Sequence, residues 1–250
     1  MKEKIIKTKK PESGVRRAFR DFWFIVAIVA GGIVAYFAGS IVGAIVLDIA
    51  QVPLSTLTPL QLQLTGYAVS HAIIFTLLIS LAHVLRGGNL RQVFGLGRVT
   101  NWNYALLLPL VYVGCLIISG VVSLIILTLM PTFQIDQAQD LGLPSVAGTG
   151  DVLLTGILLV IFAPVAEEFI FRGYLFGMLR RHASFIGASV LVSILFGLAH
   201  EQPNVIVVTF ILSLALCYIR EKTGSIWVGM GLHALQNFVA FLLLYIYDIV

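Results

Sequence analysis

Charged residues are scarce in this 250-residue sequence. Aspartate, glutamate, lysine and arginine together make up 11% of it, whereas hydrophobic residues make up 59% and the mean hydropathy is +1.00. Soluble domains carry about 25% charged residues, so this composition excludes a soluble globular domain. It also argues against nucleic-acid binding, because beyond the N-terminal arm the basic side chains stand singly or in pairs and form no basic surface.

Cysteine is nearly absent as well. The sequence has two cysteines, Cys115 and Cys217, and each lies inside an apolar stretch far from the other. Disulfide frameworks and cysteine metal sites need cysteines at characteristic spacings, which this chain lacks. Both cysteines are therefore predicted to be small buried hydrophobic side chains.

Long uncharged stretches dominate the rest of the sequence. A helix needs roughly 20 apolar residues to cross a bilayer, with a range of about 17–25. The apolar stretches, the last two of them shorter, are 22–47, 60–85, 104–130, 203–219, 223–247, 152–166 and 184–199. The sequence therefore predicts an all-α, multi-pass integral protein of the cell membrane with about seven transmembrane helices, in which residues 22–250 form a single transmembrane domain.

Residues 1–21 form a basic N-terminal arm, which holds eight of the sixteen lysines and arginines. The apolar stretch that follows is too long for a signal peptide and is predicted to be a retained anchor. Basic loops face the cytoplasm. Apart from Arg172, the other basic residues lie in 86–103, at 180–181 and at 220–222, all on the same side as the arm. The predicted topology places the N-terminus in the cytoplasm and the C-terminus outside.

Three ionisable residues interrupt an apolar helix predicted over 152–182. Glu168 and Arg172 are four positions apart, in the order that favours an ion pair on a helix. Glu167 points about 100° away from Glu168, so the arginine neutralises Glu168 and leaves Glu167 free to accept a proton. Ionisable residues inside a membrane are candidates for function by default.

Two histidines and an asparagine follow on the later helices. Glu167 and His200 are equally far from a turn predicted after Ala183, so an antiparallel pair of helices places them at the same depth. His233 and Asn237, four residues apart on the last helix, share one face at a similar depth. Polar residues at that depth need water around them. The sequence therefore predicts a polar active-site cavity within the bilayer.

This set of side chains suits the activation of water. A glutamate can take a proton from water, and a histidine beside it can share that proton. A second histidine and an asparagine amide can donate hydrogen bonds to an oxyanion, which fits hydrolysis of an acyl bond such as a peptide. A zinc site held by His200, His233 and Glu167 is the alternative that the residues leave open. The stretch "HEQPN" at 200–204 lacks the second histidine of a HExxH zinc motif.

Three short motifs carry a resemblance to a known family. "EEFIFR" at 167–172 fits EExxxR, "FGLAH" at 196–200 fits FxxxH, and "HALQN" at 233–237 fits HxxxN. In this order, over a core at 152–240, they resemble the intramembrane proteases of the CAAX protease and bacteriocin-processing family. The family is also called Abi or type II CAAX endopeptidases.

The resemblance implies an endopeptidase that hydrolyses a peptide bond at or in the membrane. It also implies a role for each motif residue: a water-activating base (Glu167), its partner (His200), two oxyanion donors (His233 and Asn237) and a supporting ion pair (Glu168 and Arg172). Phe196, the aromatic residue of its motif, is expected to pack. The expected partners are membrane lipids and a peptide or protein substrate near the membrane. Lipid-modified substrates are included, because eukaryotic members trim prenylated proteins.

The resemblance leaves two mechanisms that differ in their cofactor. The family was named for metalloproteases, and a glutamate-dependent mechanism without a metal has also been argued for its members. An asparagine facing the site suits an oxyanion hole better than a metal shell. We therefore expect no required cofactor, with zinc as the alternative.

Two other functions use the same residues. Prokaryotic members of the family are linked to bacteriocin maturation or self-immunity, and a non-catalytic immunity or scaffold protein would use the same fold for binding alone. A small proton-coupled transporter would relay protons through the intramembrane carboxylate and histidines. Transporters are typically built from repeated halves, and the sequence shows no repeat.

Overall fold

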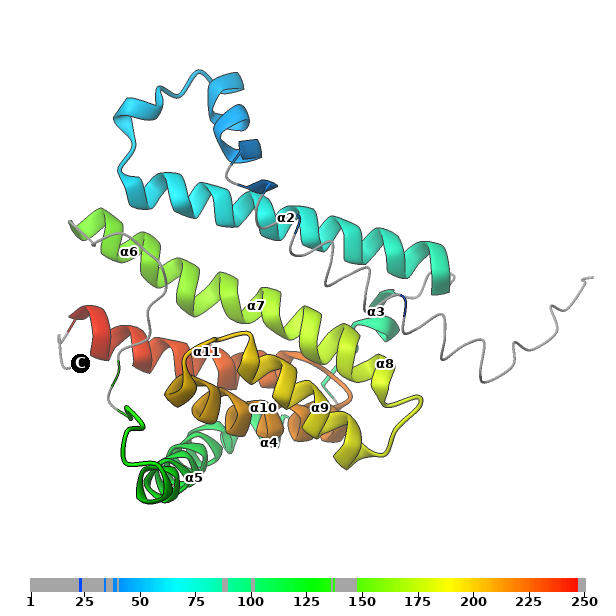
Figure 1. The fold of residues 1–250 in the computed structure, drawn as a ribbon. Helices are drawn as coiled ribbons and strands as arrows, with labels where there is room; N and C mark the ends of the chain where they lie inside the picture. The colour runs from blue at the N-terminus through cyan, green and yellow to red at the C-terminus, as the bar shows by residue number, and fades with distance from the viewer. Residues whose placement is uncertain are drawn as a thin grey trace, which may run out of the picture.

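The computed structural model is helical throughout the part of the chain that it describes (Figure 1). The described residues are Trp23, Val34, 38–39, 41–86, 90–99, 102–135, 137 and 148–246. No β-strand occurs in them, which confirms the predicted all-α class. The basic arm over 1–21 and most of the apolar stretch over 22–47 lie outside the described residues.

The N-terminal half contains two long helices among shorter turns. Its described elements, in chain order, are a helical stretch over 41–49, η1 (Leu54–Thr56), α2 (Pro59–Arg86), α3 (Leu90–Val93), α4 (Asn103–Leu106) and α5 (Leu108–Leu129). α2 has 28 residues and α5 has 22. Pro109 lies in the first turn of α5, where its missing N–H costs no helical hydrogen bond.

One long helix opens the C-terminal half. It runs from Thr149 to Leu179, a length of 31 residues. Along it follow α6 (Thr149–Ile157), η2 (Leu158–Phe162), α7 (Ala163–Glu167), η3 (Glu168–Phe176) and α8 (Gly177–Leu179). The segments η2 and η3 are π-helical, so their N–H groups pair with carbonyls five residues back, a geometry that is rare and frequent at functional sites. Glu167 ends α7 and Glu168 begins η3, so the two glutamates lie where the second π-helical segment starts.

Three helices follow the long helix. They are α9 (Phe185–Leu198), α10 (Pro203–Thr223) and α11 (Trp227–Phe241), which continues into the π-helical η4 (Leu242–Ile246). Ser184 caps α9, because its Oγ accepts a hydrogen bond from the backbone N–H of Gly187 over 3.1 Å. The chain therefore reverses where the sequence predicts, directly after Ala183. Gly224 ends α10 with φ +67°, a left-handed conformation that favours glycine.

Several of these helices match the length of a bilayer crossing. Within the described ranges, the four helices that are long and apolar enough are Leu108–Leu129, Thr149–Leu179, Pro203–Thr223 and Trp227–Ile246. They make the chain a multi-pass membrane protein. The stretch predicted as a span over 184–199 forms α9, whose 14 residues are fewer than the about 17–25 that a crossing needs. The count of seven spans stays a prediction.

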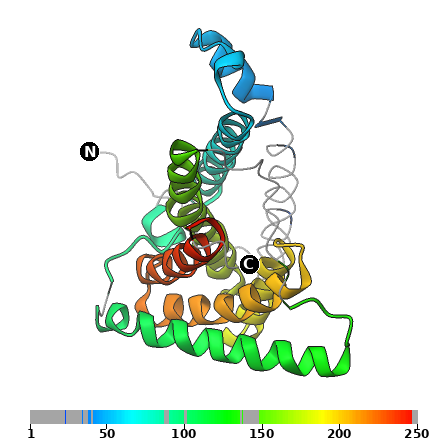
Figure 2. The same cartoon turned by 90° about the vertical axis from the view of Figure 1, so that its left-hand side faces the viewer.

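The long helix lies between two sets of helices (Figures 1 and 2). α2 runs along one side of it, while α9, α10 and α11 pack on the other side, and α5 packs against α10. Phe75 of α2 meets Phe169 of the long helix edge-on, with ring centroids 5.5 Å apart. The residues at the middle of the long helix are thus enclosed by the C-terminal helices.

The basic segments gather at one end of the helices. Arg180, directly after the long helix, pairs with Glu221 near the end of α10, with 2.7 Å between Nη2 and Oε1. Ile226, before α11, donates its backbone N–H to the carbonyl of Gly95 over 3.0 Å. The loop after α3 therefore lies beside the ends of the long helix and α10. This grouping agrees with the charge pattern, while the side of the membrane stays a prediction.

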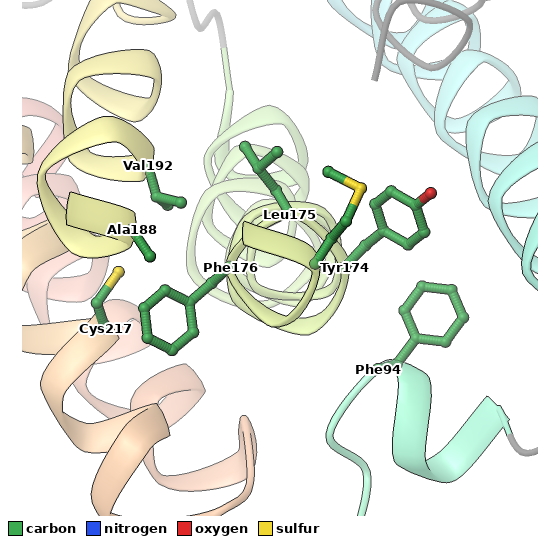
Figure 3. Close-up of a cluster of buried hydrophobic side chains, with 8 residues drawn as sticks. Phe94, Tyr174, Leu175, Phe176, Ala188, Val192 and Cys217 are labelled. Carbon is green, nitrogen blue, oxygen red and sulfur yellow. The ribbon is translucent and has the colours of Figure 1, made fainter. Parts of the chain in front are cut away.

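A buried cluster surrounds the end of the long helix (Figure 3). Phe176 points toward Ala188 of α9 and Cys217 of α10, whereas Tyr174 points toward Phe94 on the opposite side. These side chains anchor the long helix on both sides. Both cysteines of the chain are unpaired and buried, as predicted.

Candidate active site

The two adjacent glutamates of the long helix have different surroundings. Glu168 is fully buried, whereas the side chain of Glu167 is 27% exposed. Neighbouring residues on a helix point about 100° apart, so one carboxylate turns into the bundle and the other toward a more open side. The structure thus separates the two carboxylates as the helix geometry predicts.

Glu168 forms the ion pair predicted from its spacing to Arg172. Arg172 Nη1 lies 3.0 Å from Glu168 Oε1, and both residues are fully buried. The guanidinium carbon also lies 4.2 Å from the centre of the Phe196 ring, in a cation–π contact. A charge buried in this way needs a partner of opposite sign, so these three residues hold one another in place.

His233 of α11 lies between the two glutamates. Its Nδ1 is 3.1 Å from Glu168 Oε1, and its Nε2 is 3.6 Å from Glu167 Oε2. The residue is 2% exposed. One imidazole ring therefore links the buried carboxylate to the partly exposed one.

The contact with Glu168 determines which nitrogen of His233 carries a hydrogen. As the carboxylate partner of Arg172, Glu168 accepts hydrogen bonds and donates none. His233 Nδ1 is therefore the donor. Its Nε2 presents a lone pair toward Glu167 in the neutral ring and an N–H in the imidazolium.

His200 lies two residues beyond the end of α9. Its Nδ1 is 2.8 Å from the carbonyl oxygen of Phe196, which can only accept, so Nδ1 donates and Nε2 is left for another partner. In the described part of the chain no ion pair joins His200 to Glu167 or Glu168. The imidazole found against Glu167 belongs to His233 instead. Equal distance from the turn predicts depth along the two helices, but it does not specify their rotation.

The ring of Phe196 contacts both histidines of the motifs. Its ring centroid lies 4.9 Å from that of His200 and 5.6 Å from that of His233, both in edge contacts. The residue is fully buried. The packing role expected for Phe196 therefore includes contact with Arg172 and with both histidines of the motifs.

Asn237 contacts the long helix at a different point. Its Nδ2 donates a hydrogen bond to the carbonyl oxygen of Leu159 over 2.8 Å. Leu159 belongs to η2, before the glutamates. The six predicted site residues thus lie on the long helix, at the end of α9 and on α11, with His233 at the centre of the contacts.

Gly229 is a residue of this site that sequence reasoning missed. A Cβ at this position would lie 3.3 Å from Glu168 Oε2 and 3.4 Å from Leu216 Cδ2. Gly229 lies four residues before His233 on the same helix, so it shares the face that meets the glutamates. That spacing was the available signal, and it is a weak one because glycine is common in membrane helices.

The zinc alternative finds no ready-made ligand set in this arrangement. Among the residues that the structure describes, no group of three or more histidine, cysteine, aspartate or glutamate side chains is placed to hold a metal ion. Both ring nitrogens of His233 face glutamate oxygens. Nδ1 of His200 faces a backbone carbonyl. The zinc alternative stays a prediction.

A protein-family model matches the part of the chain that contains this site. The family is described as "Type II CAAX prenyl endopeptidase Rce1-like", and the match covers residues 149–239. Residues 149–239 are therefore similar to the type II CAAX endopeptidase family. The family segment starts at the first residue of α6 and ends near the end of α11, so it contains all three motifs and Gly229.

A curated protein is also similar to the chain. "Putative membrane peptidase YdiL" of Bacillus subtilis (strain 168) is 29% identical to it over 77 residues. The alignment covers 31% of this chain and 32% of the relative, so the similarity spans about a third of each. No solved structure matches the chain significantly. Together the family model and the relative mark this chain as similar to membrane peptidases of the CAAX type.

Proposed function

We propose that this protein is an intramembrane endopeptidase that hydrolyses a peptide bond at or in the membrane. The observation that carries the proposal is the position of His233 between two unlike glutamates, 3.1 Å from Glu168 and 3.6 Å from Glu167. Glu168 is buried and paired with an arginine, so it serves as a fixed charge. Glu167 is partly exposed, and among the residues that the structure describes its ion-pair partner is the histidine, so it suits the role of base.

In the proposed reaction, Glu167 takes a proton from a water molecule. The hydroxide oxygen bonds to the carbonyl carbon of the peptide, and the carbonyl oxygen becomes an oxyanion. The C–N bond then breaks, and the proton held by Glu167 passes to the leaving nitrogen, which restores the base. His200 is proposed to orient the water, because its Nε2 is left free to accept a hydrogen bond in the neutral ring.

Two groups are proposed to stabilise the oxyanion. His233 is proposed to donate from Nε2 in its imidazolium form. Asn237 has two amide N–H bonds, of which one goes to Leu159 O and the other remains for the substrate. Donors of this kind act on charge that develops during the reaction.

The proposed substrate is a peptide segment of a protein near the membrane. The family description and the name of the Bacillus subtilis relative both refer to peptidases, which supports a peptide or protein substrate. We extend the proposal to lipid-modified substrates, because the family description names a CAAX prenyl endopeptidase. Apolar helices of bilayer length around the site support attack on a segment that lies at the membrane.

Substitution of the base tests the proposal. Glu167→Gln keeps the shape of the side chain and removes its basicity, so cleavage of a peptide library by the purified full-length protein should fall by about 10²–10⁴. His200→Ala should also lower the rate. Mass spectrometry of the library measures both.

Glu221→Gln is the matched control. Glu221 pairs with Arg180 at the end of the bundle, and an exposed pair of this kind contributes only about 0–1 kcal/mol. Its cleavage rate should equal that of the wild-type protein. Cleavage at the wild-type rate by both Glu167→Gln and His200→Ala would show that the catalytic assignment is wrong.

The same assay addresses the cofactor. We propose that no metal is required, so a chelator should leave the cleavage rate unchanged and the active protein should contain no stoichiometric zinc. Loss of activity with chelator, restored by zinc alone, would favour the zinc alternative. A cellular phenotype lost in Glu167→Gln without any cleavage by the wild-type protein would favour a binding function.

A further inference from the structure

One side-chain hydrogen bond joins α11 to the π-helical turn η2. Asn237 Nδ2 donates to the backbone carbonyl of Leu159 over 2.8 Å. The two residues are 78 positions apart, and neither lies beside the glutamates in the chain. The local structure of η2 explains why this carbonyl accepts a hydrogen bond from a distant side chain.

The carbonyl of Leu159 has lost its helical partner. In an α-helix its donor would be the N–H of Ala163, but that N–H reaches Leu158 O, five residues back. In the same register the next donor, for Leu159 O, is residue 164. Pro164 has no N–H, so the carbonyl is left without a backbone donor. Unpaired carbonyls are costly inside a membrane, and the Asn237 amide supplies the missing hydrogen.

This turn immediately precedes the segment that carries the glutamates. α7 runs from Ala163 to Glu167, so any change of register at η2 rotates Glu167 about the helix axis. His233 and Asn237 lie one turn apart on one face of α11. The first contacts the glutamates, and the second holds the carbonyl two turns earlier in the long helix. α11 therefore contacts the long helix at two points, one before Pro164 and one after it.

We propose that Pro164 and Asn237 act as a pair that sets the register of the long helix and so aims Glu167 at His233. Pro164 leaves the Leu159 carbonyl without a backbone donor, and Asn237 donates the hydrogen bond that this carbonyl lacks. One amide N–H of Asn237 thus has a positioning role, because it holds the helix, and this role is separate from the oxyanion donor of the proposed function. The catalytic part of this inference rests on the proposed function, whereas the structural pairing does not.

A double-mutant cycle tests the pair. In Pro164→Ala the new N–H can donate to Leu159 O, so the Asn237 side chain becomes dispensable there. Asn237→Ala alone should lower the apparent Tm in detergent by about 3–10 °C and kcat by about ten- to a hundredfold, with little change in KM. In Pro164→Ala/Asn237→Ala the loss of Tm should be largely restored. The kcat should recover only in part, because Glu167 is aimed again while the oxyanion donor of the proposed function is still missing.

Asn204→Ala is the matched control, because Asn204 Nδ2 also donates to a backbone carbonyl, that of Gln137. Its effect should be the same with and without Pro164→Ala. An Asn237→Ala loss of Tm that Pro164→Ala leaves unchanged overturns the pairing. Restored Tm with kcat no higher than in Asn237→Ala overturns the aiming of Glu167, because the helix register would then contribute nothing to the reaction. If the wild-type protein cleaves nothing, the proposed function fails while the Tm cycle still decides the pairing.

Discussion

A single peptide bond separates two glutamates that share almost none of their neighbours. Glu168 is enclosed by Arg172, His233 and the backbone of Gly229. Removal of one partner from a buried ion pair typically destabilises a protein by about 3–5 kcal/mol, so Glu168 is needed for the fold as well as for the site. Glu167 keeps an exposed edge and one histidine neighbour. At the residue scale, burial therefore assigns support to one carboxylate and leaves the other for chemistry.

Gly229→Ala should disturb this arrangement. The added Cβ lies 3.3 Å from Glu168 Oε2, so the carboxylate has to shift away from Arg172 and His233. Overpacking of this kind costs about 1–3 kcal/mol, and we expect lower stability together with a lower cleavage rate. Thermal unfolding in detergent and the peptide assay measure the two effects.

Gly114→Ala provides the comparison for Gly229→Ala. Gly114 lies within α5, and a Cβ added there meets nothing within 4 Å. Alanine in a helix is favoured over glycine by about 1 kcal/mol, so this variant should be as stable as the wild-type protein or slightly more stable. Equal behaviour of the two alanine variants would contradict the crowding of Glu168.

At the scale of elements, the site depends on how three helices meet. The long helix supplies both glutamates, α9 supplies Phe196 and leads to His200, and α11 supplies His233. α9 has only 14 residues, so its C-terminal end and His200 lie near the level of the site instead of at a far membrane surface. The Phe196 ring fills the space between these helices.

Phe196→Leu should loosen this junction. The substitution removes the ring that lies 4.2 Å from the Arg172 guanidinium and contacts both histidines. We expect a loss of about 1–2 kcal/mol in unfolding free energy and a reduced cleavage rate. Phe162→Leu is the control on the long helix, because Phe162 is 62% exposed. A loss of the same size in both variants would show that the ring contacts of Phe196 contribute nothing specific.

At the scale of the whole molecule, the two ends of the bundle differ in charge. Arg180 and Glu221 meet at one end, in the same region as the loop after α3. Two contacts away from this end involve an acidic or an amide side chain. Thr58 contacts Asp151, and Asn204 donates to the backbone carbonyl of Gln137. The basic end is predicted to face the cytoplasm.

Cysteine labelling in intact cells tests this orientation. A membrane-impermeant thiol reagent should label Gln137→Cys from outside, and it should label Arg181→Cys only after the membrane is permeabilised. Both positions are exposed in the structure. The unchanged chain is the control, because its two cysteines are buried and should not react. Labelling of both variants from the same side would refute the predicted topology.

Much of the architecture follows from the order of residues alone. Apolar length predicts membrane helices, and the turn after Ala183 is found where the spacing places it. The Glu168–Arg172 pair is also predictable, because rise and rotation per residue are properties of the helix backbone. The three motifs lie on one continuous family segment and meet in space, at the middle of the long helix and on α9 and α11.

The contacts between helices are decided only by the tertiary structure. Sequence spacing favours His200 as the neighbour of Glu167, yet the structure places His233 there. The π-helical turns change the rotation of the long helix, and the missing N–H of Pro164 recruits Asn237 from α11. Spacing along a helix specifies depth and local neighbours. The rotation of each helix against the next depends on side-chain packing and on backbone carbonyls that lack a helical donor. Neither can be read from the spacing of residues in the sequence.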